Sequence, residues 1–417
     1  MKKILILVPG EPKRNMHSGW SGMVKDFVKT ISKSDITVYS ISSNPFNKKN
    51  INLKNFFKSQ TNTIVERSSK FESLKRLIFA FFTNLPFQSV IFSPNYSWDL
   101  QYQKLYEESD IVIFITSRVS AYFKDNKKSS LFKHKKHLIF LVDPLHICYE
   151  YHAKQTNNIF LKLLFWRESK KLKLIENFNK EFDLITLVNK YDSNFLKTNS
   201  STKIIEHPLM PYYSFKEKAI EKNDEILNFD KKRKIYLFGN FNYQPNIIGL
   251  VEFINFLSKS RINLEIFFKK NSLKIEVVGI ISKKNKLLLN KILDNYKLNK
   301  FIFIKGPIKN FKDLKKDGLA TISFVRTFYG RQTKEFDSLN LLLPILKFKN
   351  KKEGCKSFYE LKPYFLKFST VDGLIDHIKS LINKTNFIDL NKSIKKDLFT
   401  EVNRFNLFCE EILNLDK

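Results

Sequence analysis

The chain has 417 residues, more than one ordinary hydrophobic core supports, so two domains are expected. Hydrophobic residues make up 43% and aromatic residues 14%, a composition that excludes a disordered chain. Lys and Arg number 73 against 41 Asp and Glu, and the resulting formal charge of +32 predicts an anionic partner or surface. Lysine is spread along the whole chain without compact basic blocks. This distribution favours an anionic membrane surface over a nucleic acid as the partner. An AT-rich genome is an equally good explanation for part of the lysine excess.

Apolar runs alternate with segments of helical periodicity along the first half of the chain. Strands are expected at 4–8, 36–41, 111–115, 138–142 and 184–188. The helical segments are 23–32 and 160–178. This alternation predicts a parallel sheet that is covered by helices on both faces.

The pattern breaks at 206–230, a charged and weakly apolar stretch that we interpret as a linker. A second alternation follows, with strands expected at 235–238, 275–278, 301–304, 320–324 and 343–348. The sequence therefore predicts an α/β protein of two facing Rossmann-like domains with a central cleft. The predicted segments are an N-terminal domain at 1–205, the linker at 206–230, a C-terminal domain at 231–385 and a helical tail at 386–417.

The most informative stretch runs from 324 to 337, where a strand leads through a Gly-containing loop into a helix. Lys334 lies in the first turn of this helix, and Asp337 lies three residues later on the same face. A helix N-terminus offers free N–H groups and a positive dipole end, so a diphosphate can bind there beside Lys334. Asp337 can accept hydrogen bonds from ribose hydroxyls. A solvated lysine followed by an ordinary acid at a helix start is the alternative interpretation.

This stretch resembles the donor-binding motif of family-4 glycosyltransferases, with Arg326, Gly330, Lys334, Asp337 and Pro344 in register. Segments 238–246, 277–279 and 305–308 match further landmarks of that family in the same order. The resemblance implies a GT-B fold and transfer of a sugar from a UDP- or GDP-sugar, with retention of the anomeric configuration. The second domain would bind the donor through Gly239, Asn240, Arg326, Gly330, Gln332, Thr333, Lys334 and Asp337.

The motif also departs from the family pattern. Many members carry two glutamates seven residues apart, whereas this chain has Gly330 and Asp337 at those positions. Phe324 replaces the usual proline, and Leu342 replaces the usual glycine. Two alternatives to a transferase therefore stay open: a catalytically degenerate GT-B protein that binds a glycan or a partner transferase, and a nucleotide-sugar epimerase on the same fold.

The first half resembles the family more loosely, and by that resemblance it would bind the acceptor. Its expected acceptor-side loop contains His17, Gly19, Trp20 and Gly22. Asp143 and His146 follow a predicted strand, at the sheet edge where ligands bind. We expect Asp143 and His146 to join Lys334 as catalytic residues. The alternative for this pair is a loop acid and a structural histidine.

The remaining expectations concern cofactors and surroundings. The sequence lacks the usual metal-binding and Walker motifs, so no metal cofactor is expected and the nucleotide-sugar is the co-substrate. Residues 74–82 predict either a helix in a membrane interface or a helix that faces the core. We expect a peripheral protein on the inner face of the cytoplasmic membrane. Its acceptor would be a lipid-linked or polysaccharide glycan of O-antigen, capsule or lipooligosaccharide synthesis, with other envelope-glycan transferases as further partners.

Overall fold

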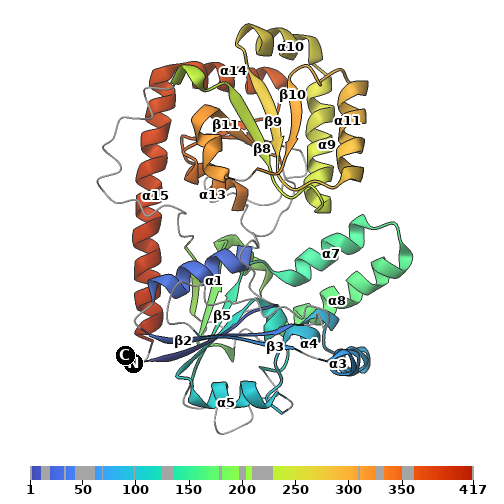
Figure 1. Ribbon diagram of the computed structural model, residues 1–417, viewed down its shortest axis with the longest axis vertical. Helices are drawn as coiled ribbons and strands as arrows, with labels where there is room; N and C mark the ends of the chain where they lie inside the picture. Colours follow the sequence, from blue (N-terminus) through green and yellow to red (C-terminus); the bar gives the residue numbers. More distant parts are fainter. Residues whose placement is uncertain are drawn as a thin grey trace. The chain divides into compact units, whose positions relative to one another are not determined.

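The structure of the protein is a computed structural model. It describes residues 2–10, 19–31, 34–42, 62–67, 69–97, 99–123, 135–177, 181–196, 203–208, 229–308, 310–324, 333–349 and 361–415. The chain forms two compact units (Figure 1). The first consists mainly of Met1–Met210 and Arg404–Lys417, and the second of Pro211–Phe328 and Gln332–Asn403.

The first unit is built on a seven-stranded sheet in the described part of the chain, and every strand pairing is parallel. Its order is β3-β2-β1-β4-β5-β6-β7, which reverses direction between β1 and β4. The strands are β1 (Lys3–Leu7), β2 (Asp35–Ser42), β3 (Asn62–Arg67), β4 (Ile111–Ile115), β5 (Lys136–Leu141), β6 (Leu184–Leu187) and β7 (Lys203–Glu206). Central strands such as β4 are entirely apolar because both of their faces are buried.

Helices cover both faces of this sheet. The described helices are α1 (Gly19–Thr30), α3 (Lys70–Phe82), α4 (Phe87–Phe92), α5 (Leu100–Glu108), α7 (Leu145–Gln155) and α8 (Ile159–Asn177). Phe27 of α1 packs on one face together with Phe405 and Phe408 near the C-terminus. Tyr102 and Tyr106 of α5 pack on the other face. The two ends of the described chain meet in this unit, where the Lys2 amine donates a hydrogen bond to the Leu413 carbonyl.

The second unit repeats the same design with a six-stranded parallel sheet in the order β10-β9-β8-β11-β12-β13. Its strands are β8 (Lys234–Phe238), β9 (Lys274–Val278), β10 (Ile302–Gly306), β11 (Gly318–Ser323), β12 (Ile345–Phe348) and β13 (Phe365–Phe368). This is the strand order of a doubly wound dinucleotide-binding fold, and it reverses between β8 and β11. A ligand of such a sheet binds beside that reversal, at the carboxyl ends of the strands.

The α-helices described in the second unit are α9 (Gln244–Ser258), α10 (Arg261–Lys270), α11 (Lys283–Asn295), α12 (Leu314–Asp317), α13 (Thr333–Asn340) and α14 (Val371–Ile382). The last helix, α15 (Lys384–Leu413), begins in the second unit, and its residues from Arg404 onward belong to the first. None of the helices in the described ranges is both long and apolar enough to cross a membrane.

The predicted α/β class with two doubly wound sheets is confirmed. One local prediction is wrong: Gly19, Trp20 and Gly22 lie in the first turn of α1 and not in a loop. The helix begins early because Trp20 packs against the core of the first unit, which favours a continuous amphipathic helix over a turn. His17 lies outside the described residues, as does most of the predicted linker.

Candidate functional site

Three strands of the second sheet end at glycines that lie side by side. The N–H of Gly239 donates to the Val278 carbonyl at 3.1 Å, and the N–H of Gly279 donates to the Gly306 carbonyl at 2.9 Å. A Cβ atom on Gly279 would lie 1.9 Å from the Gly239 oxygen, and Gly279 has φ +141°. Only glycine therefore fits at position 279. These close contacts leave bare backbone at the edge of the sheet where a ligand is expected.

Lys334 lies across this backbone from the first turn of α13. Its amine donates to the Asn246 side-chain oxygen at 2.6 Å and lies 5.4 Å from the centre of the Phe324 ring. A Cβ atom on Gly239 would come within 3.0 Å of the Lys334 nitrogen, so the glycine makes room for the lysine. Asn246 in turn donates to the Asn240 carbonyl at 2.7 Å. The amine is thus held between the ends of β8 and β11, where the strand order reverses.

The environment of Lys334 weakens its hold on a proton. Burial lowers the pKa of Lys334 to about 7, an effect that Asp337 opposes and Lys347 reinforces. Within the described ranges, no carboxylate lies at ion-pair distance from the Lys334 amine. Strongly perturbed pKa values concentrate at functional sites, which makes Lys334 a candidate site residue.

A network of buried polar side chains fixes α13 to the sheet. Glu335 accepts a hydrogen bond from the Ser323 hydroxyl at 2.8 Å and pairs with the Lys347 amine at 3.2 Å. The Thr321 hydroxyl donates to the Ser338 hydroxyl at 2.7 Å. The network therefore positions the helix turn that carries Lys334. Sequence reasoning missed Glu335 and Lys347, although a lysine inside the apolar strand Ile345–Phe348 is a signal of such a pair.

The other predicted donor-binding residues have different outcomes. Asp337 lies one turn after Lys334 in α13, and Thr333 begins that helix. Arg326, Gly330 and Gln332 lie outside the described residues. Leu342, which replaces the glycine of the family pattern, has φ +57°, a conformation that strains a leucine. Glycine would adopt this backbone conformation without strain.

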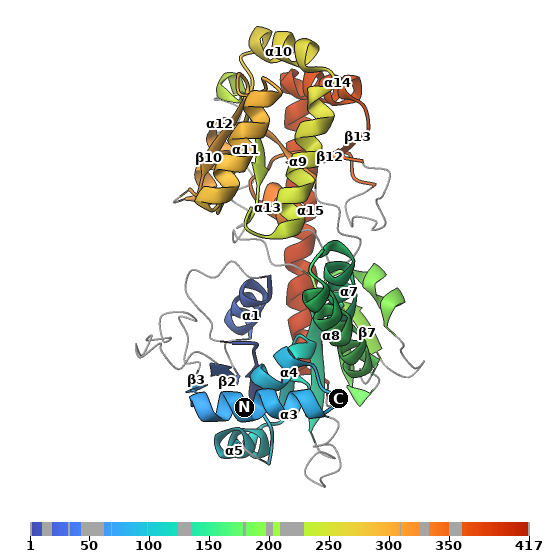
Figure 2. The same ribbon diagram turned by 90° about the vertical axis from the view of Figure 1, so that its right-hand side faces the viewer.

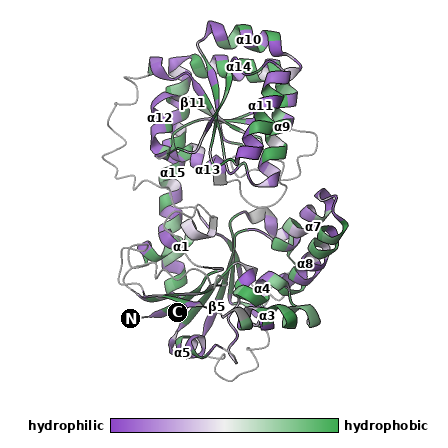
Figure 3. Ribbon diagram, turned by 45° about the vertical axis from the view of Figure 1, so that its right-hand side comes forward, coloured by the Kyte–Doolittle hydropathy of each residue, from purple (hydrophilic) through white to green (hydrophobic). Residues whose placement is uncertain are grey.

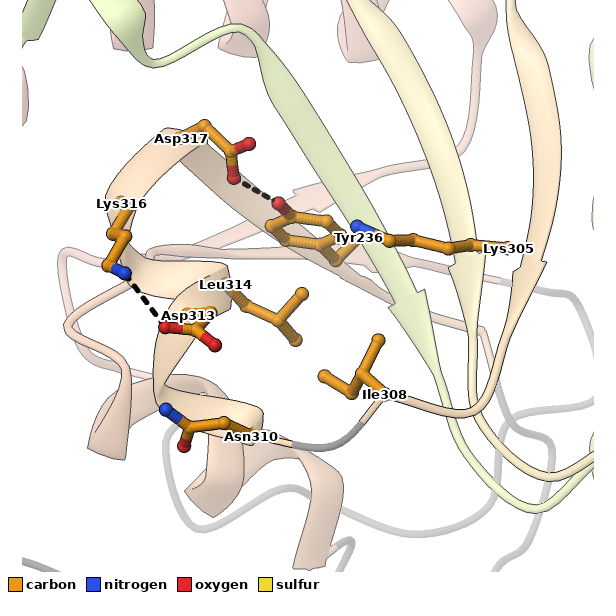
Figure 4. A pocket seen from close by; sticks show the side chains of 8 residues that line it. All are labelled: Tyr236, Lys305, Ile308, Asn310, Asp313, Leu314, Lys316 and Asp317. Atoms are coloured by element: carbon orange, nitrogen blue, oxygen red, sulfur yellow. Dashed lines mark hydrogen bonds and ion pairs between the residues drawn. The ribbon is translucent and has the colours of Figure 1, made fainter.

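A pocket of about 380 Å³ lies on the sheet face next to α12 (Figure 4). It is lined by Tyr236, Lys305, Ile308, Asn310, Asp313, Leu314, Lys316 and Asp317. Lys316 pairs with Asp313 at 2.9 Å and Lys305 with Glu276 at 3.2 Å, while the Tyr236 hydroxyl donates to Asp317. Because both lysines of this pocket already form ion pairs, they attract a diphosphate less strongly than Lys334 does.

The first unit places a second polar cluster at the carboxyl ends of β4 and β5. The His146 imidazole hydrogen-bonds Glu176 of α8, which also accepts from the Ser117 hydroxyl and the Leu145 N–H, each at 2.8 Å. His146 is buried, so this pairing holds the ring in place. Sequence reasoning missed Glu176, which is 30 residues further along the chain.

Asp143 belongs to the same cluster. Burial raises the pKa of Asp143 to about 6, with Arg118 opposing the rise and Glu176 adding to it. Thr116, at the end of β4, has φ +68°, a strained backbone of the kind that concentrates at functional sites. The Nε atom of Arg118 is buried and has no hydrogen-bond partner among the described residues. The cluster thus combines an acid whose pKa burial raises to about 6 with an arginine beside the strand reversal of this sheet.

Comparisons with known proteins identify the fold. The chain matches no known family, and no curated protein sequence matches it. Its structure is similar to that of TarM, solved from S. aureus, with TM-score 0.62 and 12% identity over 100% of this chain and 98% of that one. HepE from Anabaena, in complex with UDP and glucose, gives TM-score 0.59 and 11% identity over 99% of both chains.

A third similar structure is the lipopolysaccharide outer core galactosyltransferase WaaB, with TM-score 0.52 and 12% identity over 98% of this chain and 100% of that one. These likenesses extend over whole chains and confirm the predicted GT-B fold. The protein therefore has the fold of GT-B glycosyltransferases.

Proposed function

We propose that the protein is a nucleotide-sugar-dependent glycosyltransferase of the hexosyltransferase type, with a UDP- or GDP-sugar as its donor. The observation that carries this proposal is the Lys334 amine, which lies beside the glycine-rich ends of β8 and β9 and is bound to Asn246. The HepE complexes with UDP and UDP-glucose support a UDP-sugar on the same fold.

In this proposal the second unit binds the donor. The diphosphate lies against Lys334, the free N–H groups of the first turn of α13 and the backbone at Gly239 and Asn240. Asp337 accepts from the ribose. Arg326, Gly330, Gln332 and Thr333 complete the donor contacts that the family resemblance implies. No metal is required, because the protein's own cations and the helix dipole neutralise the phosphates.

Lys334 then acts on the reaction through charge. Negative charge grows on the departing diphosphate as its bond to the sugar breaks, and a protonated amine stabilises it. Removal of one such group costs on the order of 10²–10³ in rate. The resemblance implies that the anomeric configuration is retained and that the leaving phosphate takes the proton of the acceptor hydroxyl.

The first unit binds the acceptor in this proposal. Asp143 lies in a cluster with Arg118 and Glu176, and above its pKa of about 6 its carboxylate accepts a hydrogen bond from the acceptor hydroxyl and orients it toward the donor sugar. His146, held by Glu176, fixes that acceptor site. The family resemblance implies that His17, Gly19, Trp20 and Gly22 also belong to the acceptor site, and the last three begin α1.

The acceptor is a lipid-linked or polysaccharide glycan of the cell envelope, as in O-antigen, capsule or lipooligosaccharide synthesis. The similarity to WaaB, whose name refers to the lipopolysaccharide outer core, supports this class of acceptor. The strongly basic composition supports a location on the inner face of the cytoplasmic membrane, where other envelope-glycan transferases act as partners.

A transfer assay tests the proposal. Labelled UDP- and GDP-sugars are incubated with the protein and a glycolipid fraction, and product is compared for wild type, Lys334→Ala and Lys300→Ala. Lys300 is a matched control because its amine pairs with Glu265 at 2.5 Å. It precedes the amino end of β10, whereas the candidate site lies at the carboxyl ends of the strands. We expect a loss of about 10²–10³ in turnover for Lys334→Ala only. Full turnover in Lys334→Ala would refute the role of this lysine.

A catalytically degenerate binding protein is the second candidate. Gly330 and Asp337 stand where many family members have two glutamates, which favours binding without transfer. Donor binding without turnover, together with retention of a glycan or a partner transferase, would support this candidate. Consumption of donor without any acceptor would instead indicate the epimerase activity.

A further inference from the structure

Helix α3 of the first unit has its apolar face outward. Ile78, Phe81 and Phe82 are exposed, the last two at 66% and 82%, whereas Arg76 is buried. The Arg76 guanidinium pairs with Asp99 at 2.5 Å and donates to the Ser93 carbonyl at 3.1 Å. The apolar stripe along α3 is therefore not its core-facing side. The core-facing interpretation of residues 74–82 holds for Phe79 and Ala80, which pack in the first unit, but not for the exposed stripe.

Helix α8 continues this apolar face. Phe160 and Trp166 are 80% and 52% exposed, and Leu164 lies between them in the sequence. Phe160 and Leu164 share a helix row with Arg167 and Lys171, because residues three and four apart lie on one face. Arg167 donates to the Ala80 carbonyl at 2.6 Å, and Lys171 donates to the Thr83 carbonyl at 2.5 Å.

These contacts bring the two helices together (Figure 2). The Arg167 guanidinium lies 4.0 Å above the Phe87 ring, whose centre is 6.3 Å from that of Phe81. The exposed residues of both helices therefore form one surface, which we call the α3–α8 surface. It comprises Ile78, Phe81, Phe82, Phe160 and Leu164, and Trp166 lies further around the exposed side of α8. Figure 3 shows the hydrophobic residues along α3.

The charges around this surface identify its partner. The exposed charged side chains described on the two helices are Lys75, Lys162, Lys170 and Lys173 against Glu72 alone. The Lys170 amine lies 4.0 Å above the Trp166 ring. Aromatic and aliphatic side chains rimmed by lysines match the boundary between acyl chains and anionic headgroups. Two copies of the protein that met through this surface would bring lysines against lysines, so charge favours a lipid surface over self-association.

We propose that the α3–α8 surface docks the protein on an anionic lipid bilayer, with its phenylalanines and Trp166 inserted at the headgroup boundary and its lysines on the headgroups. The proposal rests on the part of the proposed function that places the protein at a membrane. It does not rest on sugar transfer, because docking requires neither donor nor acceptor.

Sedimentation of the full chain with vesicles tests the proposal. Wild type should bind vesicles that contain phosphatidylglycerol, bind those of phosphatidylcholine alone much less, and dissociate as salt is raised. Loss of Phe81 and Phe82 to serine should weaken binding by at least about tenfold for each residue. Lys170→Glu with Lys173→Glu should weaken binding to the anionic vesicles alone. The matched control is Ile262→Ser with Ile266→Ser on α10, since both isoleucines are 62% exposed in the second unit.

Three further readouts complete the test. The fluorescence of Trp166 should shift to shorter wavelength on anionic vesicles, and the shift should be lost in Trp166→Phe. Wild type that fails to bind anionic vesicles, or a Phe81→Ser/Phe82→Ser variant that binds them fully, overturns the proposal. Light scattering that shows wild type as an oligomer and this variant as a monomer, without vesicle binding, overturns it in favour of an interface between copies. UDP binding is measured without vesicles in parallel. A protein that binds UDP but not vesicles overturns the docking proposal alone and leaves the proposed sugar transfer standing.

Discussion

Donor binding should draw a proton onto Lys334. Without a bound donor, the pKa of Lys334 is about 7, below the ordinary lysine value of 10.5, because burial disfavours the ammonium form. A diphosphate beside the amine reverses this effect and raises the pKa of Lys334 in the complex. Donor binding is therefore strongest below pH 7 and weakens as the pH rises through the pKa of Lys334 in the unliganded protein. With a free pKa of about 7, roughly 90% of the amine is protonated at pH 6 and roughly 10% at pH 8, so affinity should fall about tenfold between them.

Isothermal titration calorimetry with a UDP-sugar measures this uptake directly. The sugar diphosphate does not titrate between pH 6 and pH 9, so a proton taken up there comes to the protein. At pH 7.5, titrations in buffers of different ionisation enthalpy should report uptake of about 0.8 proton, the fraction of Lys334 that is neutral before binding. Lys334→Met should bind weakly with no uptake and no dependence on pH. Wild type without uptake, or a methionine variant with undiminished uptake, would refute the reasoning.

Further predictions concern the same two polar clusters. Gly239→Ala should lower the affinity for UDP and keep the fold, because the added Cβ meets the movable end of Lys334. Gly279→Ala should unfold the second unit, because its Cβ would lie 1.9 Å from a backbone oxygen. Circular dichroism reports the fold and calorimetry the affinity, so together they distinguish the two variants. Lys334→Met should raise the unfolding temperature more at pH 6 than at pH 9. The lowered pKa of Lys334 means that burial of its ammonium form destabilises the folded protein fully below pH 7, and this cost shrinks as the pH rises from 7 toward 10.5. An equal rise in unfolding temperature at pH 6 and pH 9 would contradict the lowered pKa. Wild-type kcat/KM for the acceptor should rise with pH through about 6 as Asp143 ionises, and Asp143→Asn should show a lower and flatter profile; an unchanged profile in the variant would exclude Asp143.

The sequence was most informative where burial is complete. The central strands β4 and β8 are continuous apolar runs because both of their faces are covered, and both were predicted within one residue. The edge strands β3, β7 and β13 carry polar residues on a partly open surface, so their pattern does not stand out from a loop. The edge strand β10 is the exception, because its apolar run was predicted at 301–304.

The polar clusters and the direction of α3 depend on partners far along the chain. Glu335 and Lys347 are 12 residues apart, and His146 and Glu176 are 30 apart, so no local pattern links them. The stripe on α3 has the spacing of an ordinary core-facing helix. The inward side of α3 is set by partners far along the chain: Arg76 pairs with Asp99, 23 residues later, and Ala80 packs with Tyr122 and Ile175.

The central claim is that Lys334 holds the diphosphate of a nucleotide-sugar. Thermal unfolding of wild type, Lys334→Ala and Lys300→Ala with UDP, GDP, CMP and ADP tests it most directly. A nucleotide at 100 times its dissociation constant should stabilise the protein by about 2.7 kcal/mol. We predict this shift with UDP or GDP in wild type and Lys300→Ala, and a much smaller one in Lys334→Ala. No shift with any nucleotide, or an equal shift in Lys334→Ala, would contradict the claim.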